Sequence, residues 1–187
     1  MSLKEKIVET LGINKSILAL SIARMADAMG NSILFILIPL YVAKLPKVHV
    51  DFATPVLVGI LISLFGFIAA IFQPLMGALS DKLNMRKKLI QTGLGLIGVS
   101  TLFFIFADNF IHLLILRTLQ GLGVAITIPA VLSLMTAITE RSTRGGSMGV
   151  YSTFRIIGFA IGTVIGGFLQ VHYGFDAAFY VGSGFIF

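Results

Sequence analysis

The sequence of 187 residues lacks cysteine and tryptophan, and charged residues make up only 12% of it. The absence of cysteine excludes disulfides, thiolate metal sites and dithiol redox motifs. Hydrophobic residues, by contrast, make up 57% of the chain, and its mean hydropathy is +0.99. A soluble domain of this length could not bury so much apolar surface, so the composition predicts an integral membrane protein.

Acidic residues are scarce as well, with eight against 14 basic ones. Nine basic residues fall on one side of the expected membrane spans: Lys4, Lys6, Lys15, Lys82, Arg86, Lys87, Lys88, Arg141 and Arg144. Only Lys44 and Lys47 fall on the other side. This positive-inside pattern predicts a multi-pass protein with a cytoplasmic N-terminus, which we expect in the plasma membrane. A nucleic-acid partner is not expected, because no soluble basic face exists to bind one.

Apolar runs of about 20 residues or more, enough to span a bilayer, predict an all-α transmembrane fold. The expected helices are 17–43, 55–79, 89–107, 111–138 and 147–171, with a truncated sixth at 177–187. These runs lack the alternation of β-barrel strands. Short links, among them 80–88 and 172–176, leave no room for a soluble domain. The sixth run gives roughly 16 Å of helix against a core of about 30 Å, so residues 1–187 are interpreted as the N-terminal half of a longer protein.

A cleaved signal peptide is the alternative interpretation of the N-terminal segment. Lysines precede an apolar run there, and Ala26-Asp27-Ala28 is similar to a cleavage site. However, Arg24 interrupts that run, and Ile33–Val42 continues it beyond the supposed cut. We therefore expect a retained helix.

Two pairs of polar residues interrupt apolar segments with the same spacing. Arg24 and Asp27 lie three residues apart in the first segment, and Arg117 and Gln120 do so in the fourth. A charge at membrane depth costs about 2.5–3.5 kcal/mol on insertion scales, so such residues usually face a cavity or a partner. The pattern indicates a protein that moves a solute or an ion.

Three longer motifs point to a family. The first is Gly77-Ala78-Leu79-Ser80-Asp81 followed by Arg86-Lys87, the second is Arg117-Thr118-Leu119-Gln120-Gly121-Leu122-Gly123, and the third runs from Gly158 to Gly167. In this order they resemble the loop, fourth-helix and fifth-helix signatures of the major facilitator superfamily, and most closely those of its drug/proton antiporter branch. Met85 replaces a basic residue of the loop signature, and Thr163 stands where the antiporter signature has proline.

This resemblance implies two six-helix bundles that move against each other around a midplane site, each built from an inverted three-plus-three helix repeat. Residues 90 positions apart, such as Pro39 and Pro129 or Gly77 and Gly167, are consistent with that repeat. A proton gradient would supply the energy, and no cofactor is expected. The chain has no G-x-x-x-x-G-K-[ST] phosphate loop, so we expect a transporter and not an enzyme. The expected partners are a small-molecule substrate, the bilayer and the C-terminal half.

The resemblance favours proton-coupled efflux of small amphipathic or hydrophobic molecules by alternating access. A proton-coupled importer and a lipid or glycolipid flippase of the same superfamily stay open. A scaffold or receptor that transports nothing is the alternative from another class.

The resemblance also assigns roles to single residues. The fourth-helix arginine of the family is tied to proton coupling, so Asp27 is expected to be the protonation switch, with Arg117 as its electrostatic partner and Arg24 as the competing one. A structural alternative for Arg117 is an arginine that snorkels to the outer interface. His49, His112 and His172 follow no ligand spacing, so no metal site is expected.

The remaining candidates fall into three groups. The conformational latch comprises Gly77, Asp81, Arg86 and Lys87, the substrate-cavity candidates are Asn31, Gln120 and Arg155, and the helix-packing positions are Gly121, Gly158, Gly162, Gly166 and Gly167. Two roles stay open for Arg155, which are binding of an anionic group and formation of a structural ion pair. The Gly158–Gly167 ridge and the small positions Gly59, Ser63 and Gly66 are expected to need partner surfaces outside residues 1–187, which should not transport anything alone.

Overall fold

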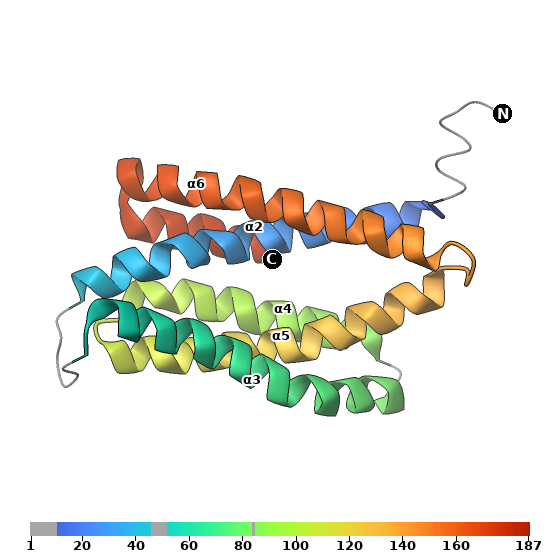
Figure 1. Cartoon of the computed structure of the whole chain (residues 1–187), viewed down its shortest axis with the longest axis horizontal. Coiled ribbons are helices and arrows are strands. Elements are labelled where there is room, and N and C mark those ends of the chain that lie inside the picture. The colour runs from blue at the N-terminus through green and yellow to red at the C-terminus, as the bar shows by residue number, and fades with distance from the viewer. Residues whose placement is uncertain (1–10, 46–51, 84) are drawn as a thin grey trace.

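A computed structural model of the chain describes residues 11–45, 52–83 and 85–187 (Figure 1). Every regular element in these ranges is helical, which confirms the all-α prediction. The elements are α2 (Lys15–Lys44), α3 (Thr54–Leu83), α4 (Arg86–Phe103), the short 3₁₀ helix η1 (Phe104–Phe106), α5 (Phe110–Ile138) and α6 (Arg144–Ile186). Lys4, Lys6, Lys47 and His49, which entered the sequence argument, lie outside the described residues.

Asparagine side chains begin two of the helices. The backbone N–H of Ile17 donates to Asn14 Oδ1 at 2.8 Å, and that of His112 donates to Asn109 Oδ1 at 3.0 Å. Each bond satisfies one of the free N–H groups at a helix start. These caps fix where α2 and α5 begin.

Helix α3 continues further than the sequence indicated. The link expected at 80–88 is helical up to Leu83, and α4 begins at Arg86. The segment Ser80-Asp81-Lys82-Leu83 contains neither glycine nor proline, so nothing in it stops the helix. Gly77 and Asp81 therefore lie on α3, while Arg86 and Lys87 lie on the first turn of α4.

Helix α6 is broken at one residue. Gly174 has φ 85° and ψ −179°, a conformation open to glycine and costly for residues with a Cβ. The link expected at 172–176 thus shrinks to this single break between two helical arms. In Figure 1 the chain reverses there, so that the second arm returns alongside α2 and the first arm.

Five helices in the described ranges are long and apolar enough to cross a membrane. Helices α3 and α6 are the most outward-facing of them, since large apolar side chains such as Phe67 (65% exposed), Val164 (73%) and Val171 (73%) point away from the protein. In water such a surface would be unfavourable, whereas hydrocarbon chains solvate it. The exposed apolar surface and the helix lengths together define a membrane protein.

The hydrophobic core lies at one end of the bundle, where α2 ends and where α3 and α5 begin. It contains Ile33, Leu37 and Val42 from α2, Leu57 and Leu61 from α3, and Phe104, Phe110, Leu113 and Phe179. The Tyr41 hydroxyl donates to the carbonyl oxygens of Phe104 at 3.3 Å and Ala107 at 3.1 Å, which ties α2 to the turn between α4 and α5. This end of the bundle is closed by packed side chains.

The glycine ridge of α6 packs within the chain. Gly158, Gly162 and Gly166 are buried, and a Cβ at these positions would press on the backbone of Met25, Met29 and Ile33. The expectation that this ridge lacks a partner was therefore wrong, because small residues let α2 and α6 approach closely. Gly121 packs in the same way against Phe65 and Ile68 of α3, whereas Gly167 has only a distant neighbour, Ile36. Gly59, Ser63 and Gly66 are exposed.

Candidate transport site

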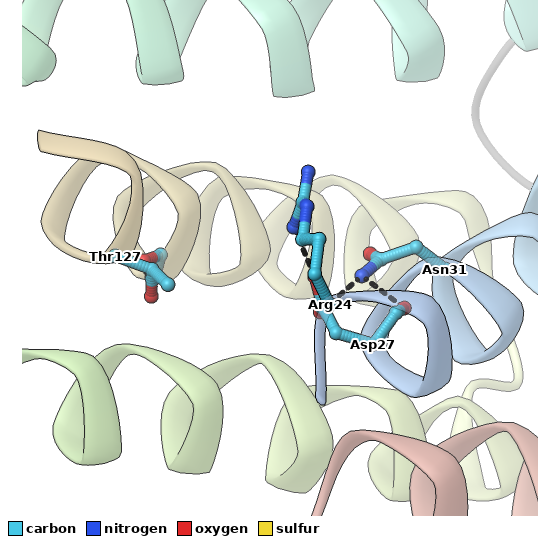
Figure 2. Close-up of polar contacts among 5 residues, drawn as sticks. Arg24, Asp27, Asn31 and Thr127 are labelled. Carbon is cyan, nitrogen blue, oxygen red and sulfur yellow. Dashed lines mark hydrogen bonds and ion pairs between the residues drawn. The ribbon is translucent and has the colours of Figure 1, made fainter. Parts of the chain in front are cut away.

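An ion pair inside the apolar helix α2 forms the centre of the candidate site. Arg24 Nη1 donates to Asp27 Oδ2, and Asn31 Nδ2 donates to Asp27 Oδ1 at 2.8 Å (Figure 2). The three residues lie at positions i, i+3 and i+7, so they share one face of the helix. Within the described residues this is the one salt bridge.

The two partners of this ion pair differ in exposure. The side chain of Asp27 is 6% exposed and that of Arg24 is 22% exposed. An unpaired carboxylate in such an environment is strongly unfavourable, and Arg24 and Asn31 satisfy both of its oxygens. A group of this kind can take up a proton when its partners move away, which is the property that a coupling site needs.

A cavity of about 240 Å³ opens beside the ion pair. Its wall combines the polar side chains of Arg24, Asp27, Asn31, Thr127 and Arg155 with the apolar side chains of Phe65, Ile97, Val124, Ile128 and Phe159. Apolar walls with a few polar groups are typical of small-molecule sites. The two expected residues Asn31 and Arg155 thus lie at this cavity, and Arg155 is exposed to it.

Arg117 is placed differently from the sequence expectation. Its Nη1 donates to Gln120 Oε1 at 3.1 Å, and its guanidinium lies 5.2 Å from the centre of the Phe65 ring. Only 6% of Arg117 is exposed, so it does not snorkel to an interface. Asp27 is paired with Arg24 instead, because it lies at the level of Thr127, roughly 15 Å along α5 from Arg117 at ~1.5 Å per residue.

Gln120, expected at the substrate cavity, is buried elsewhere. Its Nε2 donates to Thr101 Oγ1 at 3.0 Å, and 1% of the residue is exposed. Gln120 therefore joins Arg117 on α5 to α4 in a buried polar network. This network contributes no side chain to the cavity beside Asp27.

The latch candidates gather at the end of the bundle opposite the hydrophobic core. Asp81 lies near the end of α3, where its Oδ1 accepts a hydrogen bond from Ser133 Oγ of α5 at 3.4 Å. Gly77 lies beside Pro129 of the same helix α5. Arg86 and Lys87, with Lys88, line a shallow basic recess at the start of α4.

Besides the apolar wall residues Ile97, Val124, Ile128 and Phe159, three residues near the ion pair were not predicted from the sequence. They are Phe65 and Thr127 at this cavity, and Tyr151 at a smaller cavity beside it. Thr127 lies seven residues after Gln120, and Figure 2 shows it on a helix facing the Arg24–Asp27 pair. Helical spacing from the Arg117 motif through Val124 to Thr127 was the signal that could have identified this residue. Phe65 and Tyr151 are aromatic residues in apolar helices and carry no such signal.

The helices, the cavity and the buried charges define a membrane protein with a polar site inside its apolar helices. Residues 20–187 match the profile of the Major Facilitator Superfamily, and the chain belongs to this family. It is 28% identical over 168 residues to an uncharacterized MFS-type transporter of Methanocaldococcus jannaschii, covering 90% of this chain and 42% of that protein. It is 29% identical over 157 residues to the quinolone resistance protein NorA of Staphylococcus aureus, covering 84% and 39%.

A third relative is the uncharacterized MFS-type transporter YwoD of Bacillus subtilis, which is 37% identical over 139 residues, covering 74% of this chain and 29% of that protein. The chain thus spans about two fifths of the length of the first two relatives, and less of the third. The similarity supports transport through a membrane as the general function of the family.

Proposed function

We propose that this chain forms one half of a proton-coupled secondary transporter that exports small amphipathic or hydrophobic molecules by alternating access. The observation that carries the proposal is the buried carboxylate of Asp27, which lies at the wall of a mostly apolar cavity within membrane-spanning helices. Export is favoured over import by the similarity to a protein named for quinolone resistance. The proton gradient supplies the energy, and no cofactor takes part.

In this proposal Asp27 carries the proton, and Arg24 is its electrostatic partner. When Asp27 is ionised, Arg24 and Asn31 hold it; when it is protonated, its attraction for Arg24 falls and Arg24 is free to turn into the cavity. The shape and charge of the cavity therefore change with one proton. Arg117 and Gln120 support this site indirectly by joining α5 to α4.

The orientation of the chain in the membrane and a second half complete the proposed transporter. The basic residues near the helix ends support an orientation in which α2 begins on the cytoplasmic side of the plasma membrane. A C-terminal half, which would complete a protein as long as the relatives, supplies the other wall of the cavity. Arg155 faces that open side and binds either an anionic group of the substrate or an acidic side chain of the other half.

Proton-coupled import of an anion is the second candidate function, because the charges at the cavity favour it. Arg24, Asp27 and Arg155 sum to one positive charge, and protonation of Asp27 raises this sum to two. Binding of an anion would then be strengthened by the proton, and by linkage the two would move together. A neutral or cationic substrate would not gain from the proton in this way.

The test is transport by the complete protein in liposomes under an imposed pH gradient. The probes are the quinolone norfloxacin, a neutral amphipathic dye and an amphipathic carboxylate dye. Export coupled to protons predicts that a probe accumulates inside acidified liposomes, because it exchanges against protons. Co-movement of the carboxylate dye with protons would support the import function, and no gradient-dependent movement of any probe would indicate a non-transporting scaffold.

Replacement of Asp81 by Ala is expected to slow turnover severalfold and to leave the affinity for the transported probe unchanged, since Asp81 lies at the helix ends and not at the cavity. Initial rates and equilibrium binding of the same probe measure the two quantities. Ser133→Ala is the matched control, because it removes the hydrogen bond to Asp81 and keeps the carboxylate. Weakened binding with normal turnover in Asp81→Ala would contradict the latch and indicate a substrate contact.

A further inference from the structure

A second, smaller cavity touches the same ion pair from the other side. It has a volume of about 40 Å³ and is lined by Leu20, Ala23, Arg24, Asp27, Ile90, Leu94, Thr127, Val131 and Tyr151. Arg24, Asp27 and Thr127 are the residues that it shares with the larger cavity. The Arg24–Asp27 pair and Thr127 therefore border both cavities.

The two cavities differ in what they can hold. A water molecule needs about 10–15 Å³ measured in this way, so the smaller cavity has room for about three or four waters. Neither a drug-sized molecule nor a large fragment of one fits there, whereas the larger cavity is six times as large. Size alone thus separates a space for water from a space for substrate.

The wall of the smaller cavity is mostly apolar, and a few polar side chains reach it. Arg24, Asp27, Thr127 and Tyr151 contribute polar side chains to an otherwise apolar wall. The carboxylate of Asp27 and the hydroxyl groups of Thr127 and Tyr151 are the groups at this cavity that can exchange hydrogen bonds with water.

The smaller cavity lies towards the end of the bundle where α2 begins. Leu20 and Ala23 precede Asp27 on α2, Ile90 and Leu94 lie near the start of α4, and Tyr151 lies near the start of α6. At ~1.5 Å per residue these residues lie roughly 6–13 Å from the helix ends, which Figure 1 shows gathered at the end of the bundle where α2 begins. The opposite end is closed by the hydrophobic core.

We propose that the smaller cavity is a water-filled proton passage between Asp27 and the end of the bundle where α2 begins, separate from the cavity that binds substrate. This inference rests on the proposed function, in which Asp27 is the proton carrier. The passage explains how Asp27 can exchange a proton on that side without the proton crossing the substrate site.

The groups that face Asp27 are consistent with this route. Arg24 and Asn31 face it from α2, and Tyr151 and Arg155 line the two cavities from α6. From α5 the polar neighbour is Thr127, and α4 contributes only apolar side chains, Ile90 and Leu94 in the smaller cavity and Ile97 in the larger. Tyr151 lines the smaller cavity only and Arg155 the larger one only, so a proton and a substrate meet different residues of α6.

Ala23→Leu is the variant that tests the passage. Ala23 is exposed to the smaller cavity and does not line the larger one, so a larger side chain fills the water space without disturbing a packed contact. Leu94→Phe fills the same space from α4 and serves as the second variant. Ile128→Phe narrows the larger cavity only and is the matched control.

The measurements use the complete protein in liposomes with norfloxacin as the probe. Transport driven by a pH gradient requires proton exchange, whereas exchange of labelled for unlabelled norfloxacin across the membrane does not. Ala23→Leu and Leu94→Phe are expected to slow gradient-driven transport by about tenfold and to leave exchange and equilibrium affinity within about twofold. Ile128→Phe is expected to weaken the affinity and to slow both processes.

The possible results separate the passage from the proposed function. The proton passage would be wrong if both passage variants showed normal gradient-driven transport, or if they lost transport and exchange equally. Transport by the unmodified protein would still support the proposed function in either case. If the unmodified protein exchanges no norfloxacin and shows no gradient-driven movement of any of the three probes, the proposed function fails and the passage with it. Elution of each variant as a single species in size-exclusion chromatography controls for folding.

Discussion

Replacement of Asp27 by Asn is expected to abolish transport driven by a pH gradient while the complete protein still folds and binds its substrate. The amide is close in shape to the carboxylate and still accepts a hydrogen bond from Arg24, but it cannot gain or lose a proton. In the proposed function this step changes the charge of the cavity. The loss of transport is measured by initial rates of norfloxacin movement under a pH gradient. Retained folding and binding are measured by norfloxacin exchange at equal pH.

The neighbouring arginine provides the control for this prediction. In Asp27→Asn the guanidinium of Arg24 loses the charge that faces it, and a partly buried cation without a partner lowers the stability of a protein. The double variant Arg24→Gln/Asp27→Asn removes both charges, so its thermal stability should exceed that of Asp27→Asn, while proton-driven transport stays absent. Gradient-driven transport at the unmodified rate in Asp27→Asn would exclude Asp27 as the proton carrier, whichever arginine lies nearest.

The sequence predicted well what depends on local properties. The positions of the apolar runs indicated an all-α membrane fold, because the length and hydropathy of a helix depend on its own residues. The spacing of Arg24 and Asp27 indicated one face of one helix, and the two residues form an ion pair in the structure. Asn31, expected at the substrate cavity, also contacts Asp27. Their polarity within an apolar run identified the centre of the candidate site.

The partners of residues far apart in the sequence could not be predicted in the same way. Arg117 and Asp27 are separated by 90 positions, and which of them meet depends on the relative height of α2 and α5 in the bundle. The family resemblance favoured Arg117 as the partner, whereas packing brings Thr127 to the level of Asp27 and leaves Arg117 with Gln120. Small shifts of one helix along another decide which side chains meet, and the sequence pattern does not reveal these shifts.

The helix that packs against the glycine ridge of α6 could not be predicted from the sequence either. Its spacing indicated close packing against another helix, but not which helix, and we expected a partner outside the chain. The structure shows α2 against it, with Gly158 beside Met25 and Gly162 beside Met29. The helix that carries the Arg24–Asp27 pair is therefore held by glycines of the helix that carries Arg155. This contact couples the two charged elements of the cavity.

Replacement of Gly162 by Leu is accordingly expected to prevent α2 and α6 from packing and to destabilise the whole bundle. A Cβ at Gly162 would lie 2.6 Å from Met29 Cα, a backbone atom that cannot move without displacing α2. Overpacking of a well-packed interior usually costs about 1–3 kcal/mol and occasionally more, and the long Leu side chain against backbone favours the upper end. The thermal midpoint in detergent should fall markedly, and little protein should elute as a single species.

Gly149→Leu is the matched control for this last prediction, because a Cβ at Gly149 meets no atom within 4 Å and the residue is exposed on the same helix α6. Its thermal midpoint should equal that of the unmodified protein. Gly162→Ala should lie between the two, since a single methyl group requires a smaller displacement of Met29. A Gly162→Leu variant that is as stable as Gly149→Leu but inactive in transport would contradict this packing. The ridge would then contact another part of the transporter, and the core around Ile33 and Leu37 would hold α2 in position.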